Sequence, residues 1–194
     1  MRKIGYAPNK KRTGEYNGQT ALFTGENVEK AYAFHKSMGS AYNETPLISL
    51  KALAADIGVG RLLVKDESKR GSLKAFKLLG GAYAVANCIC DKLGVSISDI
   101  GFDDLKSDEV KRRLGDLVFA AASDGNHGKS VAWAAAEFNQ RAIVYMPKGT
   151  VQDRIDAIEQ LGGTVVVSDH SYDWCVSEVN RLADEKGWDI VLDT

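Results

Sequence analysis

The sequence lacks a long apolar run, and it has almost no excess of charge of either sign. Lys and Arg number 25 against 26 Asp and Glu, for a formal net charge of −1. Such a chain has no long-range field to attract nucleic acid or an anionic lipid surface, so neither is expected as a partner. Residues 1–18 contain several basic residues, but no apolar run follows them as a signal peptide requires, and we expect a polar arm there. The expected partner is a small molecule, with no membrane contact.

Cysteine is also scarce. Cys88, Cys90 and Cys175 form an odd set that has neither the spacing of a zinc site nor that of a disulfide framework. Each has apolar neighbours in the sequence, so we expect buried thiols in a cytoplasmic protein. No metal site is expected.

The chain does contain enough apolar residues for a core, since 44% of its residues are hydrophobic and 26% are charged. Short apolar runs alternate with segments of helical period, an order that builds parallel sheets through right-handed crossovers. The predicted fold class is α/β, with open, mostly parallel twisted sheets and helices on both faces. Strands are expected at 45–50, 61–65, 117–122, 142–146, 164–167 and 189–192. Helices are expected at 28–38, 51–57, from an N-cap at Ser72 to about 93, and at 128–138, 151–161 and 172–186. The highly charged segment 94–115 is expected to be a surface excursion around a short helix.

Lys77 is a candidate nucleophile. Ala75 and Phe76 precede it, and Leu78, Leu79 and two glycines follow. Apolar surroundings disfavour a charged ammonium and leave an amine that can form a Schiff base. The alternative is a solvated lysine on an amphipathic helix, with its stem lying over apolar neighbours. Spacing alone favours that alternative.

A second polar stretch, Ser-Asp-Gly-Asn-His-Gly at 123–128, follows the apolar run 117–122 and precedes a helix. Ligands of open parallel sheets bind outside the carboxyl ends of the strands, and glycines at a helix N-terminus let backbone N–H groups approach an anion. Asn126 can donate to a phenolate oxygen and Asp124 can act as a base. The alternative is a tight strand-to-helix turn with Asp124 as N-cap and His127 as a hydrogen-bonded turn residue.

The combination of these two stretches is more specific than either one. Lys-Ala-Phe-Lys-Leu-Leu-Gly-Gly-Ala at 74–82, followed by the 123–128 turn, resembles the pyridoxal-phosphate enzymes of fold type II, the relatives of tryptophan synthase β-subunit, threonine dehydratase and cysteine synthase. Within them, the sequence is most similar to the diaminopropionate ammonia-lyases. A threonine dehydratase more typically has an arginine where Leu79 stands and lacks the acid at Asp124. The similarity covers roughly 45–194 and rests on Asp124, 65–68 with Arg70, 131–135 and 191–194.

The resemblance implies that pyridoxal 5′-phosphate forms a Schiff base with Lys77, that Phe76 flanks its ring and that Asn126 hydrogen-bonds its phenolate oxygen. The other cofactor-binding positions that it implies are Gly125, His127 and Gly128. The implied reaction is an α,β-elimination, in which 2,3-diaminopropionate loses its Cα proton and expels its β-amino group, finally giving pyruvate and ammonia. Catalytic roles are implied for Lys77 and for two acids on opposite sides of the substrate, Asp124 and Asp193. A homodimer is implied for the full-length protein.

The same resemblance suggests a division of the chain. Residues 1–44 form an arm and short helix, 45–70 start a large domain, 71–168 form a smaller domain with the cofactor site, and 169–194 return to the large domain. Enzymes of this family are substantially longer, and Asp193 follows the last strand directly, so an N-terminal fragment is expected, without the phosphate-binding loop and the group facing the pyridine nitrogen. Gly71 and Ser72 stand where the family would have an aromatic residue followed by glycine.

Two other functions remain open. One is a threonine or serine dehydratase-like β-eliminase, whose leaving group is hydroxide; Asp124 favours the ammonia-lyase over it, because an additional acid suits a second amine. The other is a catalytically incomplete fragment or binding module that kept the scaffold.

Overall fold

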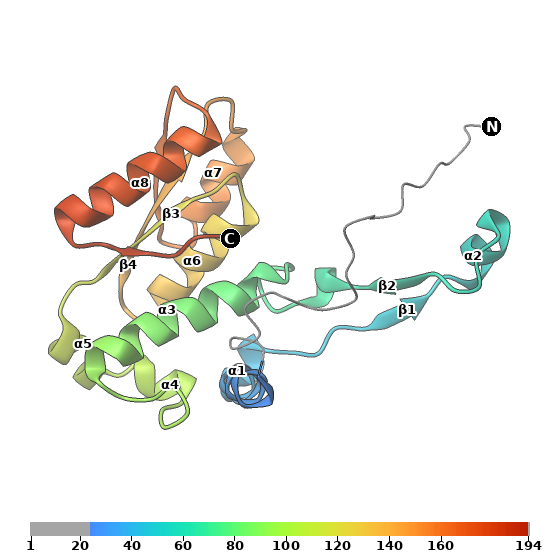
Figure 1. Ribbon diagram of the computed structural model, residues 1–194, viewed down its shortest axis with the longest axis horizontal. Coiled ribbons are helices and arrows are strands. Elements are labelled where there is room, and N and C mark those ends of the chain that lie inside the picture. The colour runs from blue at the N-terminus through green and yellow to red at the C-terminus, as the bar shows by residue number, and fades with distance from the viewer. Residues whose placement is uncertain (1–23, 194) are drawn as a thin grey trace, which may run out of the picture.

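The computed structural model describes residues 24–193, so the predicted polar arm at 1–18 and Thr194 lie outside the described residues. Its centre is a four-stranded sheet in the order β5-β4-β3-β6, of which Figure 1 labels β3 and β4. All three pairings in this sheet are parallel, as predicted. The strands are β3 (Val118–Ala122), β4 (Arg141–Met146), β5 (Thr164–Val167) and β6 (Asp189–Ile190). The predicted domain division stays a prediction, and the sheet contains strands from both sides of its 168/169 boundary.

Helices cover both faces of the sheet, and the side chains of β3 alternate between them. Phe119 and Ala121 pack into the main core, whereas Ala120 and Ala122 pack with Cys175 on the opposite face. The main core receives α3 (Lys77–Leu93), α6 (Asn126–Glu137) and α7 (Gln152–Glu159), and α8 (Tyr172–Lys186) covers the other face. The predicted α/β class with helices on both faces is confirmed, because β3 is buried on both sides.

Helices α3 and α6 pack closely because one of them carries a glycine at the contact. A Cβ atom on Gly81 would lie 2.4 Å from the hydroxyl oxygen of Ser130 on α6. Only a residue without a side chain fits this position. The close approach brings the start of α3 next to the N-terminal turn of α6.

The charged segment 94–115 is mostly exposed, as predicted for a surface excursion, but it contains more helix than predicted and is anchored in the core. It contains two helices, α4 (Phe102–Leu105) and α5 (Asp108–Leu114), and Phe102, Leu105 and Val110 are buried in the main core. The ring of Phe102 stacks on Trp133 at a centroid distance of 5.9 Å. Charged residues dominate the composition of this segment, but four well-spaced apolar residues anchor it, since Ile97 is buried in the same core.

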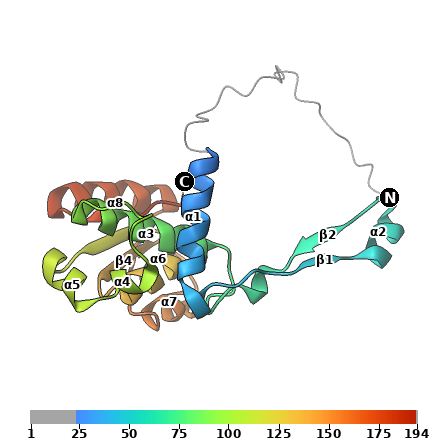
Figure 2. The ribbon, with the colours of Figure 1, turned by 90° about the horizontal axis from the view of Figure 1, so that it is seen from below.

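The N-terminal helix α1 (Gly25–Ser37) lies against α3 and α4, as Figure 2 shows. It begins at an N-cap threonine, Thr24, whose side chain accepts a hydrogen bond from the Asn27 backbone. The His35 ring nitrogen Nε2 lies 2.9 Å from the Leu79 carbonyl oxygen of α3. A single 3₁₀ turn, Gly39–Ala41, follows α1.

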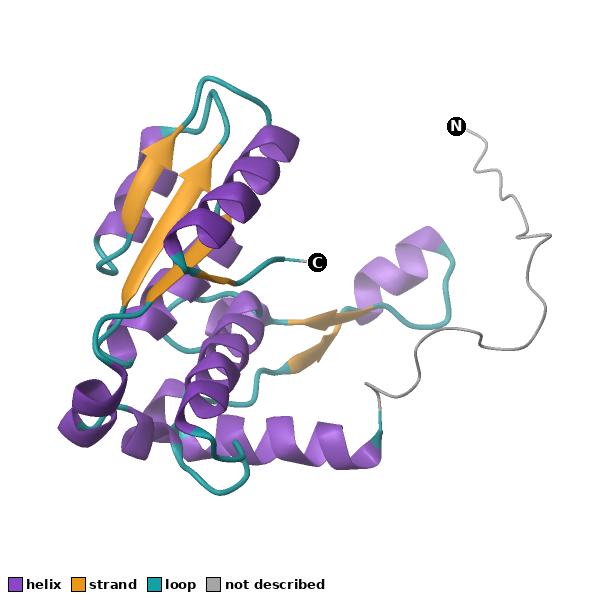
Figure 3. Ribbon diagram, turned by 60° about the vertical axis from the view of Figure 1, so that its left-hand side comes forward, coloured by secondary structure: helices purple, strands orange, loops and turns teal. Residues whose placement is uncertain are grey.

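The first two strands do not join the parallel sheet. β1 (Leu47–Ser49) and β2 (Leu63–Lys65) pair antiparallel, with α2 (Lys51–Ile57) between them, and together they extend away from the rest of the described chain (Figure 3). The prediction of a parallel sheet from the alternation of strand and helix is therefore wrong for these two strands. These strands are three residues each, and apolar side chains on all three elements are exposed, including Leu47, Leu53, Ile57, Leu63 and Val64.

The predicted N-cap of α3 at Ser72 is wrong, because the helix begins five residues later. A 3₁₀ turn at Glu67–Lys69 leads to Arg70, whose buried guanidinium pairs with Glu67 at 2.9 Å and donates to Thr45 at 3.1 Å. Lys74 then has a φ of 52°, in the left-handed region, which interrupts helical geometry. The chain therefore enters α3 at Lys77 itself.

Candidate active site

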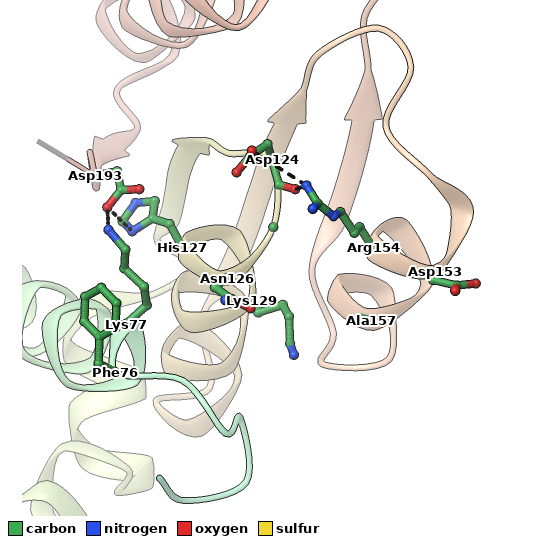
Figure 4. A pocket seen from close by; sticks show the side chains of 11 residues that line it. Phe76, Lys77, Asp124, Asn126, His127, Lys129, Asp153, Arg154, Ala157 and Asp193 are labelled. Atoms are coloured by element: carbon green, nitrogen blue, oxygen red, sulfur yellow. Dashed lines mark hydrogen bonds and ion pairs between the residues drawn. The ribbon is translucent and has the colours of Figure 1, made fainter. Parts of the chain in front are cut away.

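A cavity of about 410 Å³ opens at the carboxyl edge of the sheet (Figure 4). Parallel strands place their carboxyl ends at one edge, so residues that follow different strands meet there. The cavity gathers the start of α3, the N-terminal turn of α6, the first turns of α7 and the segment after β6. Its lining residues are Phe76, Lys77, Asp124, Gly125, Asn126, His127, Lys129, Asp153, Arg154, Ala157 and Asp193. All the site residues proposed from the sequence are therefore brought together, except Gly128.

Lys77 points at a carboxylate. Its ammonium donates a hydrogen bond to Asp193, and about 30% of each side chain is exposed (Figure 4). The ammonium also lies 5.3 Å from the centre of the Phe76 ring. The prediction of apolar surroundings for Lys77 is therefore wrong. It considered only the neighbours of Lys77 in the sequence, whereas Asp193 reaches the lysine from the segment after β6.

His127 is buried behind this pair. Its Nε2 lies 2.7 Å from the Val191 carbonyl oxygen, and its Nδ1 lies 3.9 Å from the Asp193 carboxylate. Burial lowers the pKa of the His127 imidazole, and the positive charge of Lys77 lowers it further, against the raising effect of the bond to Val191. His127 is thus hydrogen-bonded, as its alternative interpretation expected, but it lies in α6, and its role in binding the cofactor stays a prediction.

The turn before α6 is tied by a serine. The buried hydroxyl of Ser123 accepts hydrogen bonds from the backbone N–H groups of Gly125, at 3.0 Å, and Gly128, at 2.8 Å. Both glycine donors expected for an anion are therefore occupied within the chain. The expected N-cap role of Asp124 is also wrong, because Gly125 holds the cap position and makes no side-chain cap bond.

Gly128 serves packing instead of lining the cavity. A Cβ atom there would lie 2.7 Å from a methyl group of Val144 and 3.1 Å from the Cβ of Ser123. Any side chain at this position would push α6 off β4. Gly128 thus acts on the site indirectly, by allowing α6 to start close to the sheet.

Asp124 is exposed and is approached by an arginine that sequence reasoning missed. Arg154 Nη1 donates to the Asp124 carbonyl oxygen at 2.6 Å and lies 3.7 Å from its carboxylate. Lys129, Asp153 and Ala157 were missed as well. A signal did exist, since α7 follows β4, and β4 adjoins β3 at the edge where the turn lies. The order of the strands had to be known to use it.

No group of three or more metal-ligating side chains is found among residues 24–193, and no helix in that range is long and apolar enough to cross a membrane. The three cysteines, all within that range, are free thiols. Burial raises the pKa of the Cys90 thiol to about 11. The expected burial is confirmed for Cys90 and Cys175, whereas Cys88 is only half-buried.

Comparison with known proteins decides the family. The family model described as pyridoxal-phosphate dependent enzyme matches residues 39–193. This chain belongs to that family. The diaminopropionate ammonia-lyase of Escherichia coli K12 is 44% identical over 194 residues, which is 99% of this chain and 46% of the relative. The chain thus spans about half the length of that curated relative.

Two further matches place the chain within the family. A crystal structure of the Escherichia coli diaminopropionate ammonia-lyase, in complex with an aminoacrylate-PLP azomethine reaction intermediate, superposes with a TM-score of 0.79 at 40% identity and covers 94% of this chain and 44% of that one. The biosynthetic L-threonine dehydratase of Salmonella typhimurium is 31% identical over 144 residues, 74% of this chain and 23% of the relative. The resemblance to the diaminopropionate ammonia-lyases and the fold type II class are confirmed by these similarities.

Proposed function

We propose that this chain contributes one side of the active site of a pyridoxal-phosphate-dependent ammonia-lyase. The proposed reaction removes ammonia from 2,3-diaminopropionate and gives pyruvate and ammonia. The observation that carries the proposal is the meeting of Lys77 with Asp193 and the 123–128 turn in one cavity. The 44% identity to a diaminopropionate ammonia-lyase over nearly the whole chain supports the choice of substrate.

The residues of the cavity fit the reactive end and the ring of pyridoxal phosphate. Its volume lies in the range typical of small-molecule sites. Lys77 provides a primary amine that can react with the aldehyde of the cofactor. Phe76 provides an exposed flat ring beside that amine, and Asn126 provides an exposed amide that can donate to the phenolate oxygen. Since Ser123 engages Gly125 and Gly128, we propose that the phosphate is held by residues other than these two glycines. Bound there, the cofactor supplies an electron sink for the Cα carbanion.

The proton transfers and the positioning of the amine are assigned to three side chains of the cavity. We propose that Lys77 holds the cofactor and takes the Cα proton from one face of the substrate, while Asp193 holds the lysine amine in place. Asp124 lies at a different part of the cavity from Asp193, held at its backbone by Arg154. This separation supports Asp124 as the acid or base of the other face, where it exchanges a proton with the substrate.

The runner-up is a threonine or serine dehydratase-like eliminase. Asp124 beside the cavity favours the ammonia-lyase, since a carboxylate suits a substrate with a second ammonium group. The lower identity to the threonine dehydratase agrees with this preference. The domain division stated above, a homodimer of the full-length protein and a cytoplasmic location are further parts of the proposal, and the free thiols support the last of them.

The proposal is tested by incubating the chain with pyridoxal phosphate, reducing with borohydride and locating the label by mass spectrometry. We expect the label on Lys77 and none at that position in Lys77→Ala. Lys129→Ala is the matched control, because Lys129 lines the same cavity on α6. Equal labelling of many surface lysines, with no preference for Lys77, would contradict the proposal and leave the binding-module alternative.

A further inference from the structure

His127 joins three parts of the site that are far apart in the sequence. It lies in the first turn of α6, its Nε2 lies 2.7 Å from the Val191 carbonyl oxygen, and its Nδ1 lies 3.9 Å from the Asp193 carboxylate. That carboxylate in turn accepts a hydrogen bond from Lys77 of α3 (Figure 4). The Val191 N–H still donates to the Ala120 carbonyl oxygen of β3 at 2.9 Å, and Asp193 follows two residues later, outside the strand. The histidine ring therefore holds the chain at the point where Asp193 is presented.

The protonation of the ring follows from its contacts. A carbonyl oxygen only accepts hydrogen bonds, so the short contact to Val191 places the ring hydrogen on Nε2. Burial lowers the pKa of the imidazole, which favours the neutral ring. A neutral imidazole has one N–H, so Nδ1 carries a lone pair.

That lone pair faces a carboxylate oxygen, which is another acceptor. Two acceptors cannot bond to one another, and 3.9 Å is beyond hydrogen-bond distance. A proton on Asp193 changes this, since a carboxylic acid can donate to Nδ1, either directly after a small closure or through one water. The charged residues around the ring on this side of the cavity are Lys77 and Asp193, so the proton donor next to Asp193 within the chain is the Lys77 ammonium.

We propose that His127 is a positioning residue that makes the Lys77 amine nucleophilic by accepting a hydrogen bond from protonated Asp193. In this step an N–H bond of the Lys77 ammonium breaks and an O–H bond forms on Asp193. The products are a neutral Lys77 amine and a neutral Asp193 carboxylic acid, and the acid donates a hydrogen bond to Nδ1 of His127. No net charge is created, because an ion pair becomes two neutral groups. The role in catalysis rests on the proposed lyase function, whereas the proton step concerns only these three side chains.

The chain contains a matched internal control. His35 is half-buried, its Nε2 lies 2.9 Å from the Leu79 carbonyl oxygen, and this burial lowers the pKa of its imidazole too. Its ring neighbours are aromatic, among them Tyr42 stacked at 6.1 Å. Among the described residues, no carboxylate lies within ion-pair distance of its ring. His35 thus has the same tautomer-fixing contact without an acid at Nδ1.

The first test is nitrogen NMR of the ring nitrogens in the 194-residue chain, which has only three histidines. We expect His35 and His127 both to carry the hydrogen on Nε2 near neutral pH. Asp193→Asn is expected to shift the Nδ1 resonance of His127 and to leave that of His35 unchanged. A hydrogen on Nδ1 of His127, or a His127 ring unaffected by Asp193→Asn, would overturn the proposal.

The second test measures the rate at which formaldehyde and a mild hydride reagent methylate Lys77, resolved by mass spectrometry. This reaction needs a neutral amine and no pyridoxal phosphate, so its outcome is independent of the proposed function. In His127→Gln the amide can still donate to Val191, and we expect methylation of Lys77 to slow about fivefold, the effect of one hydrogen bond, with Lys129 unchanged. An unchanged Lys77 rate in a folded variant would also overturn the proposal. If His127→Gln does not fold, the Asp193→Asn spectra decide alone.

Discussion

Lys77 donates its hydrogen bond to Asp193, 116 positions further along the chain. The lysine begins α3 on one layer, whereas the aspartate follows β6 at the edge of the sheet. Their contact therefore depends on the packing of α3 against α6 and on the pairing of β6 with β3. Substitutions that disturb either packing are expected to act on the site without touching it.

Gly81→Ala is expected to destabilise the fold and to weaken the cofactor site together. The added methyl group would meet Ser130 at 2.4 Å and force α3 away from α6, at a cost of about 1–3 kcal/mol. Urea unfolding measures the first effect, and borohydride-fixed labelling of Lys77 measures the second. Gly80→Ala is the control, because nothing lies within 4 Å of a Cβ there, and it should stabilise α3 by about 0.5–1 kcal/mol. Similar stability for the two variants would contradict the close packing.

Ser123→Ala is expected to lower the free energy of unfolding by about 1–3 kcal/mol. The change leaves two buried N–H groups, those of Gly125 and Gly128, without their acceptor. Ser177→Ala on the exposed face of α8 should stay within about 0.5 kcal/mol of the parent chain. Increased labelling by pyridoxal phosphate in Ser123→Ala would show that the freed donors bind the phosphate, contrary to our proposal that other residues do.

Asp124→Asn and Asp193→Asn are expected to affect the two enantiomers of 2,3-diaminopropionate unequally. The two carboxylates have different partners, Arg154 for one and Lys77 for the other, and lie in different parts of the cavity. The turnover of each enantiomer in a full-length protein measures the difference. Equal losses on both enantiomers in both variants would count against acids acting on two sides of the substrate.

Acid is expected to destabilise the chain below about pH 6.5, partly through two histidines. Burial lowers the pKa of both His35 and His127 below 6.5, so in the window below that value the unfolded chain binds more protons than the folded one. The contribution of the two neutral histidines to the free energy of unfolding is complete above that window. It is lost as the pH falls through their lowered pKa. The urea midpoint should therefore be lower at pH 5.5 than at pH 7.5. His127→Gln should reduce this difference, and His170→Gln, on the surface, should not.

The local sequence determined the elements that carry their own pattern. The helix at Lys51–Ile57 was predicted at its observed bounds, and the strand 164–167 and the helix 172–186 likewise, because apolar spacing and a terminal glycine are read from neighbours in the chain. The two motifs around Lys77 and Asn126 identified the family, since each motif is a continuous stretch.

Tertiary structure decided what each of these residues contacts. Lys77 meets a carboxylate instead of an apolar pocket, Arg154 reaches Asp124 from another helix, and Ser123 takes the glycine N–H groups expected for an anion. It also decided that β1 and β2 pair with each other instead of joining the parallel sheet. Periodicity records which face of an element is buried, but the partner across that face comes from another part of the chain. The residues and elements are thus set by local sequence, whereas the charges and hydrogen bonds of the site depend on the order of the strands and the packing of α3 on α6.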